Sequence, residues 1–145
     1  MSHISSYQTE IRLEPAAQGS SEAKESRQLL RDAVAAVAEE RNGFVSEEIS
    51  DYFGRKTRVD VALVTKVFPA GIGLRVHPET GEVEFLYDAY GGYKRVIDNL
   101  CEEIGQNYTA LAVTRALQDL HYEVDYEETA AESSNRRRIV VRGVL

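Results

Sequence analysis

The chain has few of the features that hold many small proteins together. It carries one cysteine, Cys101, in 145 residues, which excludes an intrachain disulfide and an all-cysteine metal site within one chain. It has no tryptophan and three prolines. No segment approaches the ~20 apolar residues that a membrane-spanning helix needs. The first five residues lack a basic region followed by an apolar block, so we expect no secretory signal.

Basic residues are also in deficit. Asp and Glu number 24 against 17 Lys and Arg, which gives a net charge of −7 at pH 7. This balance argues against a nucleic-acid partner, because proteins that bind polyanions usually present a basic surface. The lone thiol fits a reducing compartment, so we expect a cytoplasmic protein. Because the sequence has no long apolar run, we expect no association with a membrane.

What the chain does contain is a globular composition. Hydrophobic residues make up 43% and charged residues 28% of it. A chain of this length forms one domain and buries enough surface to fold without disulfides. We therefore expect a single domain over residues 1–145.

The first part of the chain predicts one strand and one helix. Residues 4–13 alternate between apolar and polar side chains, which favours a strand. A helix is predicted over residues 22–41, where apolar residues recur at helical spacing at Leu30, Val34 and Val37. Gly43 follows the helix, and we expect it to adopt the left-handed conformation that ends many helices.

The middle of the chain predicts a meander. Residues 44–57 fit a short strand or a cover for the sheet edge, with an exposed aromatic turn at Tyr52 and Phe53. Residues 59–87 then alternate in three runs separated by Pro- and Gly-containing turns, which predicts three antiparallel strands. In the first run we expect one face to carry Val59, Val61 and Leu63.

The last part predicts helix followed by strands. Residues 96–106 and 111–120 have helical spacing and form one bent helix or two helices, joined near Gly105 and Asn107. Two closing strands are predicted over residues 122–126 and 138–145. The order β–α–β–β–β–α(α)–β–β predicts an α+β fold, with an antiparallel sheet of five to six strands and two to three helices packed on one face.

Several short segments occur together in an order that resembles a known family. They are residues 1–5 with 9–11, 52–54 with 58–64, 74–76, 82–92, and Tyr108 with the stretch up to Val124. In this order the chain resembles the domain-of-unknown-function 1257 family, which includes the hypothetical chloroplast reading frame thirty-five proteins. The resemblance departs at His121, where the family has glycine. It implies an accessory protein, because the family's members are often encoded near ATPases of the AAA type, and it implies no catalytic residue.

The glycine pair after the meander is the main candidate site. A strand that runs into Gly91-Gly92 and then a helix can present backbone N–H groups to an anion, and Lys94 and Arg95 would add positive charge. The segment matches neither the P-loop nor the dinucleotide-binding pattern. The alternative is a turn that needs only the conformational freedom of glycine.

Tyrosine gathers at the same place. The chain has eight tyrosines, and three lie near the glycine pair. Tyrosine favours recognition surfaces and is also a good strand former, so both interpretations remain open. We expect ligand or partner contacts from Tyr87, Asp88, Tyr90, Gly91, Gly92, Tyr93, Lys94 and Arg95.

The remaining reactive residues favour structural roles. His3, His77 and His121 lack metal-type partners at close spacing, so we expect no metal site. Cys101 lies beside the apolar stripe of its predicted helix, which indicates an inert thiol. The basic run at residues 136–138 fits a solvated hairpin better than an anion-binding arm. We expect no catalytic residue and no cofactor.

Two functions follow from these observations. The first is a non-enzymatic accessory or interaction protein that acts on a protein partner, for which the resemblance suggests an ATPase of the AAA type. The alternative is a protein that binds or sequesters a small anionic ligand, phosphorylated or nucleotide-like, with homo-oligomerisation left open. A hydrolase or transferase ranks last, because the sequence shows no nucleophile–base pair and no metal motif.

Overall fold

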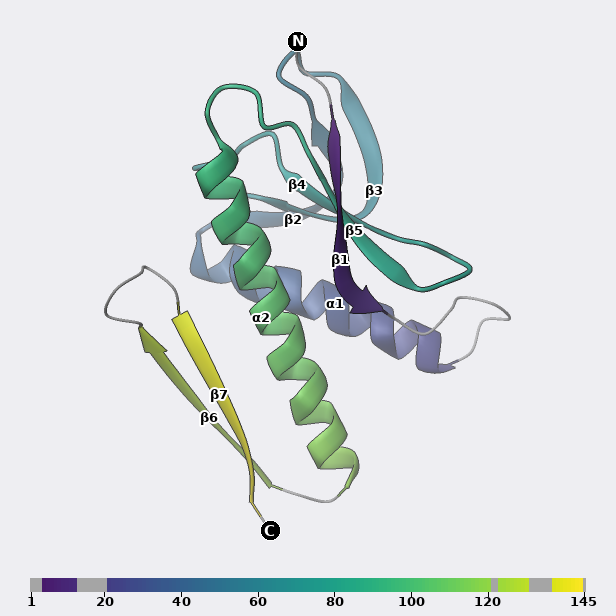
Figure 1. Ribbon diagram of the computed structural model, residues 1–145, viewed down its shortest axis with the longest axis vertical. Coiled ribbons are helices and arrows are strands. Elements are labelled where there is room, and N and C mark those ends of the chain that lie inside the picture. The colour runs from purple at the N-terminus through teal and green to yellow at the C-terminus, as the bar shows by residue number, and fades with distance from the viewer. Residues whose placement is uncertain (1–3, 13–20, 121–122, 131–136, 145) are drawn as a thin grey trace.

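The computed structural model describes residues 4–12, 21–120, 123–130 and 137–144, with side chains described at positions 4–6 and 24–120. Two helices pack against a five-stranded antiparallel sheet with the order β1-β5-β4-β3-β2, which confirms the predicted α+β fold (Figure 1). The elements in chain order are β1 (Ser5–Arg12), α1 (Ser21–Glu40), β2 (Phe44–Ser50), β3 (Lys56–Val64), β4 (Ile72–Val76), β5 (Glu82–Tyr87), α2 (Lys94–Asp119), β6 (Glu123–Ala130) and β7 (Arg137–Val144).

Strands β6 and β7 form a separate two-stranded sheet. Figure 1 shows this hairpin beside α2, away from the five-stranded sheet, and β7 makes the closer contact with the helix. The sequence analysis predicted both closing strands but did not predict that they form a sheet of their own. A two-stranded sheet is marginal by itself in water, so its packing on α2 supplies the support it needs. The side chains of the basic run at residues 136–138 lie outside the described part.

The main core lies between the helices and one face of the sheet. Its side chains come from both helices and from the three strands of the predicted meander, with Leu30, Val34, Val37, Val61, Leu63, Leu74, Val83, Phe85, Ile97, Leu100 and Ile104 among them. The three members from α2 recur at helical spacing, which places them along one side of the helix. The sequence pattern thus identified the face that each helix buries.

A smaller cluster lies on the other face of the sheet. Its buried members are Ile49, Val59, Ala62 and Leu86. Val59 belongs here because the pairing of β2 with β3 shifts between Ser46↔Ala62 and Glu48↔Arg58. This bulge reverses the alternation, so the prediction that Val59 shares a face with Val61 and Leu63 is wrong.

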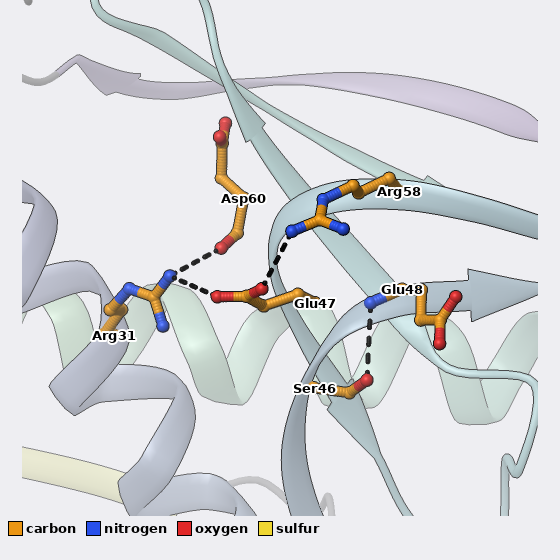
Figure 2. A network of polar contacts seen from close by, with 6 residues as sticks. All are labelled: Arg31, Ser46, Glu47, Glu48, Arg58 and Asp60. Carbon is orange, nitrogen blue, oxygen red and sulfur yellow. Dashed lines mark hydrogen bonds and ion pairs between the residues drawn. The ribbon is translucent and has the colours of Figure 1, made fainter.

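The bulge is held by polar contacts from three elements. Figure 2 shows Arg31 of α1 reaching the main chain of Asp60 and the carboxylate of Glu47, which also binds Arg58. The Arg31 guanidinium donates to the Asp60 carbonyl at 3.0 Å, and the Val76 amide donates to the Asp60 carboxylate at 2.7 Å. These bonds satisfy backbone groups of β3 and β4 from outside the strand ladder.

The bulge bends the β2–β3 hairpin over the second face of the sheet. The end of β2 thereby reaches the loop between β3 and β4, where the Ser50 amide donates to the Ala70 carbonyl at 2.8 Å. A Cβ atom on Gly73 would lie 2.6 Å from Cγ1 of Val59, so glycine provides the space that the reversed Val59 occupies. This bend places the turn after β2 near the end of β5.

Helix α1 ends differently from the prediction. Asn42, not Gly43, adopts the left-handed conformation, with φ of 55°. Asparagine tolerates this region better than most residues. Gly43 is needed for space, because a Cβ atom there would lie 2.2 Å from the Val64 carbonyl oxygen.

Helix α2 is a single helix that continues through the predicted joint at Gly105 and Asn107. The side chain of Asn107 donates to the Glu103 carbonyl at 2.9 Å, and the Thr109 hydroxyl donates to the Gly105 carbonyl at 2.9 Å. Both side chains bond one turn back along the helix without ending it. In the described part of the chain, neither helix has the length and apolar character needed to cross a lipid bilayer.

Candidate functional site

Two turns that are distant in the sequence meet at one buried carboxylate. Asp88 follows β5 and is 3% exposed. One of its oxygens, Oδ2, accepts from the Tyr52 amide at 2.8 Å, and Oδ1 accepts from the Tyr90 amide at 3.0 Å. The carboxylate therefore fastens the turn after β2 to the turn after β5.

The turn after β2 is organised by Asp51. Its Oδ1 accepts from the amides of Phe53 and Arg55, both at 2.9 Å, and its Oδ2 binds the Arg55 guanidinium. Gly54 has a φ of 83°, which suits glycine. Burial by itself would raise the pKa of Asp51, but the hydrogen bonds and charge of Arg55, with the Phe53 amide, outweigh it and hold the pKa below its ordinary value.

The turn after β5 depends on its two glycines. Gly91 and Gly92 have φ values of 98° and 83°, a region that other residues rarely adopt. A Cβ atom on Gly92 would meet nothing within 4 Å, so the conformation, rather than a lack of space, requires glycine here. The positive φ angles thus explain why the turn contains two glycines, and the anion-binding interpretation stays a prediction.

Aromatic rings from both turns lie against one another. The rings of Tyr52 and Tyr90 are 4.4 Å apart between centroids at an angle of 61°, and those of Phe68 and Tyr93 are 5.1 Å apart at 62°. Tyr52 is 59% and Tyr90 48% exposed, whereas Phe68 is 1% exposed. Two tyrosines thus stand at the surface above a buried phenylalanine.

A pocket of about 310 Å³ opens between these rings. We call it the aromatic pocket. It is lined by Ser50, Asp51, Tyr52, Gly54, Phe68, Pro69, Ala70, Asp88, Tyr90 and Tyr93. The two turns and the loop between β3 and β4 each supply part of its wall.

Of the eight predicted site residues, three line the aromatic pocket, namely Asp88, Tyr90 and Tyr93. Gly91 and Gly92 shape the turn. The remaining residues of the set are not among the lining residues: Tyr87 packs partly buried against the main core, Lys94 is exposed and pairs with Asp98 at 3.0 Å, and Arg95 is exposed.

Sequence reasoning missed the other walls of the pocket. It noticed Tyr52 and Phe53 as an exposed aromatic turn but did not connect them with Asp88. The available signal was the aspartate that begins Asp51-Tyr52-Phe53-Gly54, a residue type that often organises a turn through its own side chain. Phe68 gave no comparable signal, because one buried aromatic in a loop is ordinary.

The other reactive side chains have structural surroundings. Burial, with the nearby Asp98 charge, raises the pKa of Cys101 to about 12, so its thiol stays protonated near neutral pH. The Nδ1 atom of His77 accepts from the Glu79 and Thr80 amides at 3.3 Å and caps its turn. Within the described ranges, no group of three or more His, Cys, Asp or Glu residues could hold a metal ion. His3 and His121 lie outside the described residues.

No protein-family model matches the chain, and no curated protein or solved structure matches it. The resemblance to the domain-of-unknown-function 1257 family stays a prediction. What the site can do is therefore inferred from its geometry.

Proposed function

We propose that this chain is a non-enzymatic interaction protein that holds a partner protein at the aromatic pocket. The observation that carries the proposal is the convergence of two turns on Asp88, which sets two half-exposed tyrosines over a pocket with a buried aromatic floor. Tyrosine anchors are favoured at protein interfaces because they offer a large apolar surface with few rotatable bonds.

The pre-formed shape of the pocket supports this function. The Asp51 and Asp88 carboxylates fix both turns through five hydrogen bonds to backbone or side-chain groups, two on Asp88 and three on Asp51. Because both turns are already fixed, this chain loses little additional conformational entropy when a partner binds there. The family resemblance makes an ATPase of the AAA type the first class of partner to test.

The small-anion alternative receives less support. The lining of the aromatic pocket includes two aspartates and neither lysine nor arginine. Lys94, which was expected to attract an anion, is engaged by Asp98. Both observations argue against a small anion as the ligand of the aromatic pocket.

The test is a selection of peptides from a random library displayed on phage, using the full chain as bait. We expect selected peptides to bind the Tyr52→Ala/Tyr90→Ala variant about 1–4 kcal/mol more weakly, as measured by calorimetry. Phe44→Ala is the matched control, because Phe44 is 61% exposed and is not among the lining residues. Circular dichroism shows whether each variant is folded. Selected peptides that bind the folded double variant as tightly as the original chain would contradict the proposal.

A further inference from the structure

The chemistry of the aromatic pocket indicates what enters it. Four of its ten lining residues are aromatic, and two are aspartates. The faces of aromatic rings carry negative charge density and attract cations. The Asp88 carboxylate adds negative charge at the same place, whereas the charge of Asp51 is balanced by Arg55. An anionic group would be repelled there, and a purely apolar group would make no favourable electrostatic interaction with this negative charge.

The neighbouring turn already binds a cation in this manner. The guanidinium carbon of Arg55 lies 5.9 Å from the centroid of the Phe53 ring, while its Nε binds the Asp51 carboxylate. One guanidinium thus contacts both a ring and an aspartate. Asp51 lines the aromatic pocket, and Phe53 lies in the sequence between two residues that line it, Tyr52 and Gly54. Residues of the same two types, aromatic residues and aspartates, line the aromatic pocket itself.

The size and the overall charge agree with a single side chain from a basic partner. About 310 Å³ is at the lower end of the range for ligand sites, which suits one long side chain better than a cofactor. The net charge of −7 attracts basic segments at long range. Arginine fits best among basic residues, because its planar guanidinium stacks on rings and donates several hydrogen bonds to carboxylates.

We infer that the aromatic pocket binds an arginine side chain from a basic segment of the partner protein, with the rings of Tyr52, Tyr90 and Tyr93 and the carboxylate of Asp88 as its recognition groups. This inference rests on the proposed function, since it names what the same pocket receives. To the proposed function it adds that the side chain received from the partner is positively charged and is an arginine.

The test titrates the full chain with Nα-acetyl-arginine methylamide and with the corresponding citrulline compound, which has nearly the same shape but no charge. Ring signals of Tyr90 and Phe68 are followed by nuclear magnetic resonance. We expect the arginine compound to shift these signals and to bind about 5- to 30-fold more tightly than the citrulline compound. Equal binding of the two compounds, or no shift of the pocket rings by the arginine compound, would overturn the inference.

Two double variants separate ring faces from apolar surface. Tyr52→Leu/Tyr90→Leu keeps apolar side chains but removes the rings, whereas Tyr52→Phe/Tyr90→Phe keeps the rings. We expect the arginine compound to bind the Leu pair about 5- to 30-fold more weakly and the Phe pair within about twofold of the original chain. Equal affinity of the two folded variants would count against the inference.

Failure of this inference can be told apart from failure of the proposed function. Library peptides that require Tyr52 and Tyr90 but are not enriched in arginine would overturn the inference and leave the proposed function in place. Peptides that bind independently of the pocket would overturn the proposed function. Tetramethylammonium is the remaining probe. If it binds more tightly than the arginine compound, the arginine inference is overturned, and the pocket binds a small quaternary ammonium ligand instead of a protein segment.

Discussion

Replacement of Asp88 by alanine is the sharpest test of how the site is built. The change removes the carboxylate that joins the turn after β2 to the turn after β5, a contact between residues 36 positions apart. It leaves the Tyr52 and Tyr90 amides without their acceptor. We expect both the free energy of unfolding and the affinity of the aromatic pocket to fall.

The magnitude follows from the two hydrogen bonds at 2.8 Å and 3.0 Å. Hydrogen bonds to a charged acceptor contribute about 1.5–3 kcal/mol each. Tyr52 and Tyr90 are 59% and 48% exposed, so water can reach part of the main chain that Asp88 releases. We therefore expect Asp88→Ala to lower the free energy of unfolding by about 2–4 kcal/mol, which is less than the sum of the two bonds.

The measurement is urea denaturation followed by circular dichroism. A loss of this size moves the midpoint by about 1–2 M, with the slope typical of small domains. Asp98→Ala is the matched control, because it removes a carboxylate from the exposed ion pair with Lys94 and should cost less than about 0.5 kcal/mol. If Asp88→Ala is no more destabilising than Asp98→Ala, the Asp88 carboxylate does not organise the site.

Three further predictions concern the core and α2. Leu63→Ala and Leu100→Ala should each lower the free energy of unfolding by about 2–5 kcal/mol, because both residues are at least 98% buried. A loss below about half a kilocalorie per mole at both sites would refute the packing of the helices on the sheet. Gly105→Ala should raise the free energy of unfolding by about 0.5–1 kcal/mol, since the added Cβ meets nothing within 4 Å, and denaturation that shows a loss would contradict this. With a pKa of about 12, Cys101 should react slowly with iodoacetamide at about pH 8 and faster in urea, and equal rates in the folded and unfolded states would contradict this. The free energy of unfolding should also decline as the pH rises above the ordinary pKa of a thiol.

Local periodicity was sufficient to predict most of the fold. The helical spacing of Leu30, Val34 and Val37 identified α1 and its buried face, and the Gly- and Pro-containing turns separated three strands of the sheet. These features depend on residues within about a turn of one another. The length of α2 was harder to predict, because Gly105 weakens a helical pattern without requiring a break.

The face of Val59 could not be predicted in the same way. Its position in the alternating run places it with Val61 and Leu63, but the register shift against β2 turns it to the other face. The partners that hold the bulge, Arg31 and Val76, come from other elements. A bulge is therefore a property of strand pairing, which alternation within one strand does not reveal.

The same bulge explains why only one of the two turns of the site was predicted. In a flat antiparallel sheet of this order, the turn between β2 and β3 and the residue after β5 would lie at opposite ends, because β2 and β5 lie three strand positions apart and run in opposite directions. The bend at residues 59–61 carries the β2–β3 hairpin back over the sheet until the Ser50 amide reaches Ala70 and the Tyr52 amide reaches Asp88. Glycine at position 73 makes room for this bend. The aromatic pocket thus depends on residues that do not touch it, and the sequence could identify the tyrosines at its mouth without identifying the strand geometry that brings them together.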